Sequence, residues 1–238
     1  MHLLIPAAGI GRRMGSECLR QGFAQRNKLL LTLRSQPLIT WTLLAAEASR
    51  CISWIGIISQ PADWTDLKEI LAGLSLTKPI QIVQGGTTRQ ESVYNGLQAL
   101  PSAAKQVLIH DGARCLATPD LFDRCAEAIQ HCSGLIAAVP VKDTIKVVDG
   151  GLIQSTPDRS QLWAAQTPQA FDVQMLKQCH ETGRRQGWEV TDDAALFEKC
   201  GLAVQIVEGE ETNLKLTTPI DLAIAEFILQ QRLGAADL

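Results

Sequence analysis

The sequence predicts an α/β protein: a doubly wound, twisted and mostly parallel sheet from which a β-hairpin arm protrudes. Along most of the chain, short apolar runs alternate with longer segments of helical spacing. The runs are apolar throughout, as strands are when helices cover both faces of a parallel sheet. Residues 141–161 break this alternation and are predicted to form the arm. Since 238 residues can bury a sizeable core, we expect residues 1–238 to form a single domain.

Five short apolar runs are predicted to be buried strands. They lie at residues 3–5, 55–59, 80–83, 107–109 and 135–139. In a sheet of this kind, ligands bind outside the carboxyl ends of the strands. The loops that begin near Pro6, Gly85 and Asp111 each follow such an end. We therefore expect these three loops to meet at one site.

Helices are predicted between these strands and after the arm. Their expected positions are residues 37–48, 64–71, 88–100, 119–131, 173–186, 192–199 and 218–233. Thr118 stands before Pro119 as an N-cap, and the proline falls in the first turn, where its missing N–H is no loss. One more strand is predicted at residues 203–207, before the last helix.

The arm is predicted from two strand-forming segments joined by a glycine turn. Residues 142–148 and 152–156 flank Asp149-Gly150-Gly151, and an Asp-Gly turn supplies the positive φ angles that a tight hairpin needs. Because an isolated hairpin is marginal in water, the arm must pack on something. Its own domain is one surface on which it could lie.

Composition and charge exclude several classes of protein. A net charge of −3 gives no overall attraction to nucleic acid, and the five tryptophans are dispersed without interleaved basic residues. The seven cysteines are odd in number and include no C-x-x-C pair, which predicts reduced thiols rather than disulfides or structural zinc. No stretch approaches the length of a membrane span, and no basic region precedes the first apolar run. We expect a cytoplasmic enzyme without nucleic-acid or membrane partners.

The loop after the first run has the composition of a nucleotide-phosphate site. Gly9 and Gly11 let the backbone turn sharply and expose its N–H groups. Arg12 and Arg13 offer forked donors to phosphate oxygens. A dinucleotide-binding dehydrogenase needs a third glycine where Met14 stands, so that interpretation weakens. A simple tight turn also explains two glycines, but the arginines favour the phosphate site.

Further short motifs follow in one order over nearly the whole chain. They are Asn27-Lys28-Leu29-Leu30, Gly85-Gly86-Thr87-Thr88-Arg89-Gln90-Glu91-Ser92-Val93, His110-Asp111-Gly112-Ala113-Arg114, Asp143-Thr144, Asp158-Arg159, Gln166-Thr167-Pro168-Gln169, Thr191-Asp192-Asp193-Ala194 and Asn213-Leu214-Lys215. With the first loop, the chain resembles the 2-C-methyl-D-erythritol 4-phosphate cytidylyltransferase family, which uses CTP in the non-mevalonate isoprenoid pathway. Each motif alone is weak evidence, whereas eight in register are specific.

The resemblance implies a Rossmann-like nucleotidyltransferase fold and transfer of the cytidylyl group of CTP to 2-C-methyl-D-erythritol 4-phosphate. An acceptor phosphate oxygen attacks the α-phosphorus and pyrophosphate leaves, so the protein must position two anions and stabilise the developing charge. By analogy with the family, the catalytic cations are Arg13, Lys28 and Lys215. Asp111 would be the carboxylate for Mg²⁺, a cation that commonly combines one carboxylate with substrate phosphates.

The resemblance also assigns the substrate sites and a partner. CTP contacts are expected from Ala7, Ala8, Gly9, Gly11, Gly85, Gly86, Ser92 and Gly112. Acceptor contacts are expected from Arg114, Thr144, Arg159, Thr167 and Thr191. In the family the arm embraces a second subunit to form a homodimer, so Arg159 would reach the acceptor from the other subunit.

Four residues of these motifs have an interpretation that involves no ligand. Ser92 is equally a solvated residue at a helix start. His110 is interpreted as structural, because an ionised acceptor phosphate needs no general base. Asp192 and Asp193 fit a capped helix start better than a second metal pair.

Two departures from the family pattern affect the site. Residues 15–26 lengthen the phosphate loop, so Arg20 or Arg26 could compete with Lys28 for the triphosphate. Gly112 and Cys115 stand where the family usually has alanine and proline. The glycine preserves close backbone approach, whereas the cysteine leaves the following turn less restricted than proline would.

Two other functions agree with parts of the pattern. A relative of the family could use another polyol phosphate, such as ribitol 5-phosphate. A catalytically silent nucleotide-binding protein could retain the fold, but it would be expected to lose Arg13, Lys28, Asp111 or Lys215, and all four are present.

Overall fold

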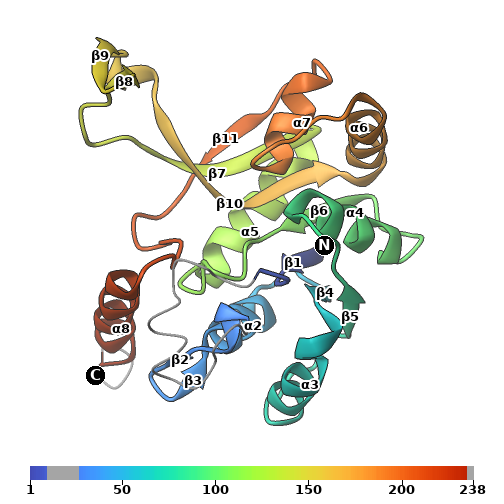
Figure 1. Cartoon of the computed structure of the whole chain (residues 1–238). Coiled ribbons are helices and arrows are strands. Elements are labelled where there is room, and N and C mark those ends of the chain that lie inside the picture. Colours follow the sequence, from blue (N-terminus) through green and yellow to red (C-terminus); the bar gives the residue numbers. More distant parts are fainter. Residues whose placement is uncertain (10–26, 235–238) are drawn as a thin grey trace.

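A computed structural model describes residues 1–9 and 27–234 of the chain. Gly11, Arg13, Arg20 and Arg26, which the sequence analysis considered for the phosphate loop, lie outside the described residues. Figure 1 shows a central sheet with helices on both faces and a hairpin that projects from one end of it. No described helix combines the length and the apolar character that crossing a bilayer requires.

The central sheet of the described chain has seven strands in the order β11-β7-β10-β6-β1-β4-β5. Their bounds are His2–Pro6 (β1), Trp54–Ser59 (β4), Ile80–Gln84 (β5), Gln106–Ile109 (β6), Gly134–Pro140 (β7), Trp163–Asp172 (β10) and Gln205–Glu208 (β11). Only β10 runs antiparallel to its neighbours among these strands. The mostly parallel α/β sheet that the sequence predicted is therefore confirmed.

Helices cover both faces of this sheet, so its central strands β1 and β6 are buried on both sides. One face is covered by α2 (Leu38–Ala48), α3 (Trp64–Ala72) and α5 (Pro119–Ala128), and the other by α4 (Arg89–Ala99), α6 (Val173–Gln186) and α7 (Asp193–Lys199). In β1, Leu3 and Ile5 pack on the first group and Leu4 on the second. Two-sided burial explains the uninterrupted apolar runs.

Smaller elements complete the fold. A third apolar cluster joins α8 (Pro219–Gly234) to the short hairpin of β2 (Thr32–Leu33) and β3 (Gln36–Pro37). The helix expected at residues 119–131 ends as a 3-10 turn, Ile129–His131. The predicted cap is confirmed, since Thr118 Oγ1 accepts a hydrogen bond from the Leu121 N–H at 3.2 Å.

Strand β10, which the sequence pattern did not predict, lies between β6 and β7 in the middle of the sheet. Pro168 stands inside this strand, and a proline normally argues against a central strand because it has no N–H to donate. The structure accommodates it at an irregularity, where the pairing of β10 with β7 shifts between Ala165 and Gln169. Thr167, which was predicted to bind the acceptor, therefore also belongs to the central sheet.

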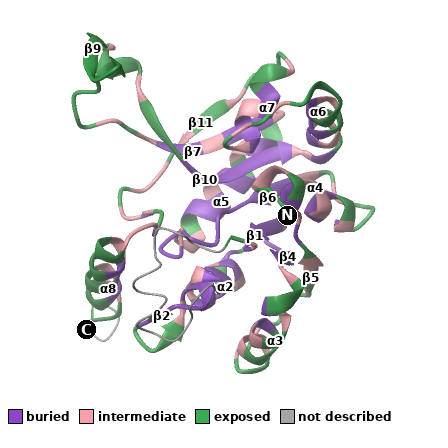
Figure 2. Cartoon of the chain, in the orientation of Figure 1, coloured by how far each residue is buried: buried purple, intermediate pink, exposed green. Residues whose placement is uncertain are grey.

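The predicted arm is confirmed as a protruding hairpin of β8 (Val147–Asp149) and β9 (Leu152–Ser155). Gly150 and Gly151 have φ angles of +55° and +81°, as the predicted turn requires. Its first strand is shorter than expected, because residues 142–146 are not paired. Every residue of both strands is exposed, including Leu152 (70%) and Ile153 (64%) (Figure 2). The arm therefore does not lie on its own domain.

Candidate functional site

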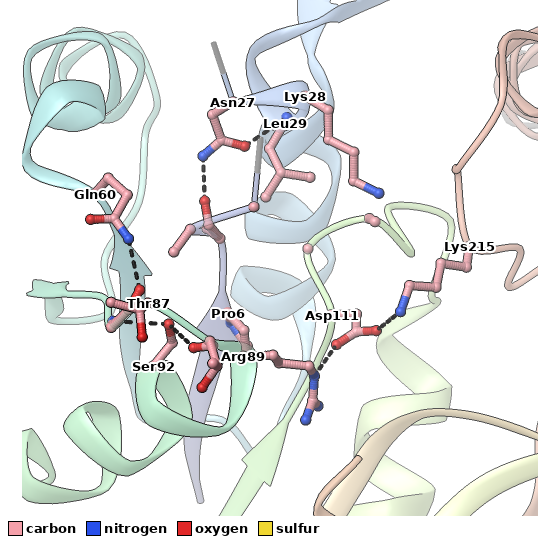
Figure 3. Close-up of a pocket in the computed structure, with 17 residues that line it drawn as sticks. Pro6, Asn27, Lys28, Leu29, Gln60, Thr87, Arg89, Ser92, Asp111 and Lys215 are labelled. Carbon is pink, nitrogen blue, oxygen red and sulfur yellow. Dashed lines mark hydrogen bonds and ion pairs between the residues drawn. The ribbon is translucent and has the colours of Figure 1, made fainter. Parts of the chain in front are cut away.

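A cavity of about 460 Å³ lies at the carboxyl ends of β1, β4, β5 and β6. It is lined by residues 6–9 after β1, Gln60 after β4, residues 86–89 after β5 and residues 111–113 after β6. Residues 27–29 and Lys215 complete the wall, and Figure 3 shows these side chains around the cavity. The strand order reverses at β1, the position at which doubly wound sheets bind ligands.

Most of the predicted nucleotide and catalytic residues within the described chain meet at this cavity. Those that line it are Ala7, Ala8, Gly9, Lys28, Gly86, Ser92, Asp111, Gly112 and Lys215. Gly85 lies behind the wall, where an added Cβ would come within 2.7 Å of Ala8 Cβ. The predicted acceptor residues do not line it: Arg114, Thr144, Arg159, Thr167 and Thr191.

Asp111 is held between two cations on one wall of the cavity. Its Oδ1 lies 3.2 Å from Arg89 Nε and its Oδ2 lies 2.6 Å from Lys215 Nζ (Figure 3). Burial alone would raise the pKa of Asp111, but the charges of Arg89 and Lys215 outweigh it and hold that pKa well below its usual range. The carboxylate is therefore ionised at neutral pH.

Arg89 belongs to the motif of residues 85–93, but no role was predicted for it. Besides Asp111, it contacts a second carboxylate, with Nη1 at 2.8 Å from Asp193 Oδ2. Burial would lower its pKa, yet Asp193 and Asp111 together raise the pKa of Arg89 above its ordinary value. Its place in the first turn of α4 was visible in the sequence, but the carboxylates that hold it were not.

Asn27 anchors the segment that carries Lys28 at the wall of the cavity. Its side chain accepts from the Leu29 N–H at 3.0 Å, donates to Asp63 Oδ2 at 3.0 Å and also donates to the Ala7 carbonyl. These bonds cap a 3-10 turn, Lys28–Leu30, against the end of β1. Lys28 Nζ then donates to the Leu216 carbonyl at 2.8 Å, next to Lys215.

Ser92 is buried and shapes the loop after β5, which contradicts the interpretation of a solvated residue at a helix start. Its Oγ accepts from the Gly86 N–H at 3.0 Å and donates to the Thr88 carbonyl at 2.8 Å. On the other side, Gln60 Nε2 donates to the Gly86 carbonyl at 2.9 Å. The two polar groups of Gly86 are thus held from two elements, and this loop presents a fixed edge to the cavity.

His110 and Thr167 form a buried support behind Asp111. Thr167 Oγ1 accepts from the Asp111 N–H at 3.0 Å and lies 3.1 Å from His110 Nδ1, while His110 Nε2 lies 3.1 Å from the Arg114 carbonyl. A carbonyl only accepts, so Nε2 carries the proton and Nδ1 accepts from the threonine. Burial lowers the pKa of His110 to about 4, and this neutral, fully enclosed ring agrees with the structural interpretation.

The remaining predicted acceptor residues are dispersed. Arg114 donates from Nη1 to the Asn213 carbonyl at 2.8 Å and from Nη2 to the Ala165 carbonyl at 3.0 Å. Thr144 and Arg159 are exposed on the arm, where Arg159 donates to the Lys142 carbonyl at 2.7 Å. Thr191 is exposed immediately before the N-cap of α7. This set does not form one enclosed site within a single described chain.

The helix start after Thr191 is confirmed only in part. Asp192 is the N-cap of α7, accepting from the Ala195 N–H at 3.1 Å. Asp193 lies in the first turn of α7, where its charge favours the helix dipole, and its buried carboxylate also contacts Arg89 and His180. A local pattern identified the cap, whereas the ion pair depends on residues far away in the sequence.

One carboxylate of the cavity suits a divalent cation. Asp111 is the acidic residue on the described wall, and no group of three or more His, Cys, Asp or Glu side chains of the described chain forms a metal cage. Both Asp111 oxygens contact cations, but a carboxylate offers about four lone-pair sites. The donor set therefore fits Mg²⁺ that takes its other ligands from phosphates and water.

Comparisons with known proteins show the family of this chain and the similarity of its fold. The family model described as IspD: 2-C-methyl-D-erythritol 4-phosphate cytidylyltransferase matches residues 1–231. A protein of that name from Nostoc punctiforme is 76% identical over 233 residues, which cover 98% of this chain and 99% of the relative. Two crystal structures are similar in fold. The 4-diphosphocytidyl-2C-methyl-D-erythritol synthase of Anaerococcus prevotii has a TM-score of 0.83 and 31% identity, covering 96% of this chain and 97% of its own. The 2-C-methyl-D-erythritol 4-phosphate cytidylyltransferase of Thermus thermophilus has a TM-score of 0.75 and 32% identity, and the match covers 96% of this chain and 98% of the Thermus chain.

Proposed function

Because this chain belongs to the 2-C-methyl-D-erythritol 4-phosphate cytidylyltransferase family, we propose that the cavity at the strand ends is its CTP site. The enzyme is a nucleotidyltransferase of the non-mevalonate isoprenoid pathway. It transfers the cytidylyl group of CTP to 2-C-methyl-D-erythritol 4-phosphate and releases pyrophosphate. The convergence of glycine loops, Lys28 and Lys215 on one cavity is the observation that carries the assignment of the site.

The chemistry requires cations that face developing negative charge. When an acceptor phosphate oxygen attacks the α-phosphorus, charge builds on the nonbridging oxygens and on the leaving pyrophosphate. Lys28 and Lys215 lie on the cavity wall, and Arg13 would add a guanidinium from the loop outside the described residues. Fixed cations reduce the repulsion between two anionic substrates and stabilise the transition state more than the ground state.

Asp111 would hold Mg²⁺ together with phosphate oxygens of the nucleotide. When bound, the cation would screen the phosphate charge and polarise the reacting phosphoryl group. Lys215 contacts the same carboxylate, so this lysine lies where it can move from Asp111 to a phosphate oxygen.

The cytosine edge would be read by backbone groups of the loops after β1 and β5. Ala7, Ala8 and Gly86 approach the cavity closely, and Ser92 and Gln60 fix the orientation of Gly86. A pyrimidine is distinguished by a few donors and acceptors at fixed positions, which a rigid loop supplies better than long side chains.

Gly85→Ala is expected to raise the KM for CTP by about tenfold, since overpacking at such a site costs roughly 1–3 kcal/mol. The new Cβ would lie 2.7 Å from Ala8 Cβ and 3.3 Å from Ser92 Oγ, so two parts of the base site must move apart. Steady-state kinetics at saturating acceptor measure the effect. Gly73→Ala is the matched control, because its Cβ would have no neighbour closer than 3.5 Å. An unchanged KM in Gly85→Ala would contradict the placement of the base.

The acceptor site would be completed by a second subunit. Thr144 and Arg159 are exposed on the arm, and the apolar side chains of that arm, such as Leu152 and Ile153, are not covered by the described part of their own chain. In a homodimer the arm would bury these side chains and bring Arg159 to the partner's cavity. Arg114, Thr167 and Thr191 would contribute from the subunit that holds CTP.

Arg159→Ala is expected to raise the KM for methylerythritol phosphate by about tenfold or more, with little change in the KM for CTP, because charge-assisted hydrogen bonds are the strong ones. Separate titrations of each substrate measure this split. Arg185→Ala, at an exposed arginine on α6, is the control. A change confined to CTP would contradict the acceptor role.

Mixing experiments test whether Arg159 acts from the other subunit. Arg159→Ala and Lys28→Ala subunits are each expected to be weakly active alone. After they are unfolded and refolded together, the mixed dimer contains one site with both residues intact, so activity should return. No recovery, with mixed dimers demonstrated by mass, would place Arg159 in its own subunit's site.

Pyrophosphate release tests the reaction itself. Purified protein with CTP and Mg²⁺ is expected to release pyrophosphate only when methylerythritol phosphate is added. Ribitol 5-phosphate and a reaction without acceptor are the comparisons. Release with ribitol 5-phosphate alone would keep the chemistry and change the acceptor, whereas release with neither would refute the assignment.

A further inference from the structure

A continuous chain of charged contacts leads from the cavity into the core. Lys215 contacts Asp111 at 2.6 Å, Asp111 contacts Arg89 at 3.2 Å, Arg89 contacts Asp193 at 2.8 Å, and Asp193 contacts His180 at 3.2 Å. Arg89, Asp193 and His180 come from α4, α7 and α6, the three helices on one face of the sheet. The first three members, Lys215, Asp111 and Arg89, line the cavity already described, whereas Asp193 and His180 lie behind it.

The inner pair is fully enclosed and has a defined arrangement of donors. Asp193 is 1% exposed and His180 is 0% exposed. Burial would raise the pKa of Asp193, but Arg89 and His180 hold that pKa below its usual value, so the group is a carboxylate that only accepts. His180 Nε2 therefore donates to Asp193 Oδ1, while Asp193 Oδ2 accepts from Arg89.

This arrangement divides the guanidinium of Arg89 between two carboxylates. Nη1 goes to Asp193 and Nε to Asp111, so Asp111 receives one of the five N–H groups of Arg89 rather than a bidentate pair. Without its contact to Asp193, the guanidinium of Arg89 could rotate and form a bidentate pair with the Asp111 carboxylate. Such a pair would occupy lone pairs that the proposed metal and Lys215 use.

We propose that His180 and Asp193 are positioning residues of the nucleotide site, which hold Arg89 in place and thereby keep Asp111 accessible to its ligands. The proposal rests on the assignment of this cavity to CTP. His180 contributes through Asp193: the N–H on its Nε2 fixes the carboxylate that anchors Arg89. Neither residue touches the cavity, so their effect on the nucleotide passes through Arg89.

The test is the affinity for CTP, measured by calorimetry in the presence of Mg²⁺ and without acceptor. His180→Leu removes the donor, and Asp193→Asn removes the charge that holds Arg89; each is expected to weaken CTP binding by about tenfold. His180→Gln is the matched control, because its amide N–H can replace Nε2, and its affinity should stay within about twofold of wild type. Thermal unfolding of every variant separates loss of folded protein from loss of affinity.

A double-mutant cycle shows whether the effect passes through Arg89. In an Arg89→Gln background, His180→Leu is expected to change CTP affinity by less than about twofold, because the residue that it positions is already absent. Unchanged CTP affinity in both His180→Leu and Asp193→Asn, or full additivity with Arg89→Gln, would overturn the inference alone. Wild-type protein that does not bind CTP would overturn the assignment of the cavity, and the inference with it.

Discussion

Lys28→Ala is expected to lower kcat by about a hundredfold or more, the effect of removing one fixed donor from developing charge. Lys28 is held at the cavity wall by the 3-10 turn that Asn27 caps (Figure 3). Its Nζ donates to the carbonyl of Leu216, the residue after Lys215. This arrangement places two ammonium groups where two anionic substrates would meet. The fold should survive, because the hydrogen bond to the Leu216 carbonyl is worth only about 1 kcal/mol.

Single-turnover measurement of cytidylyl transfer separates this loss of rate from weaker CTP binding. Lys68→Ala is the matched control, since it removes an exposed lysine from α3, away from the cavity. Lys28→Arg should recover part of the rate, because it keeps the charge but changes its geometry. Turnover of Lys28→Ala near that of wild type would transfer the role to an arginine of residues 10–26.

Asp111→Asn is expected to have the second large effect, lowering turnover by about a hundredfold at physiological Mg²⁺. The substitution keeps the shape of the side chain but removes the charge that the metal needs. It also leaves Arg89 and Lys215 beside each other without the carboxylate that separates them. The affinity for Mg²⁺ should fall together with the rate, and a large excess of Mg²⁺ should restore part of the activity.

Titration of the rate with Mg²⁺ at fixed CTP measures the effect of Asp111→Asn. Asp120→Asn is the control, because Asp120 pairs with Arg124 on the exposed side of α5. An unchanged Mg²⁺ requirement in Asp111→Asn would exclude this carboxylate as the metal ligand. The depressed pKa of Asp111 also stabilises the fold above the ordinary carboxyl pKa, and that contribution is lost as the pH falls through the lower folded-state value. The variant should therefore lose less stability on acidification than wild type.

The sheet and the position of the site could be predicted because they depend on local patterns. Uninterrupted apolar runs predicted strands that are covered on both faces. The turn at Gly150 and Gly151 depends only on the positive φ angles of these two residues. Parallel strands align their carboxyl ends at one edge of the sheet. The loops that begin near Pro6, Gly85 and Asp111 therefore meet at that edge, whatever the positions of the helices. Most of the residues that were predicted to bind the nucleotide and that follow those strands line the cavity for this reason.

The strand β10 shows where a local rule misleads. Pro168 argues against a central strand, yet an irregularity in the pairing lets the chain pass it and continue between β6 and β7. The same segment supplies Thr167, whose hydroxyl supports Asp111. Whether such a segment pairs as a strand depends on which strands lie beside it in the fold. The residues of the segment itself do not identify those strands.

Partners in the site were decided by the tertiary structure. The sequence by itself determined that Arg89 opens a helix and that Asp193 follows a cap, but these two residues lie 104 positions apart. Lys215 and Asp111 are separated by the same distance along the chain. Which carboxylate pairs with which cation follows from the packing of α4 and α7 on one face of the sheet, because a charge in a low-dielectric interior must find its counter-ion among the groups that packing places beside it.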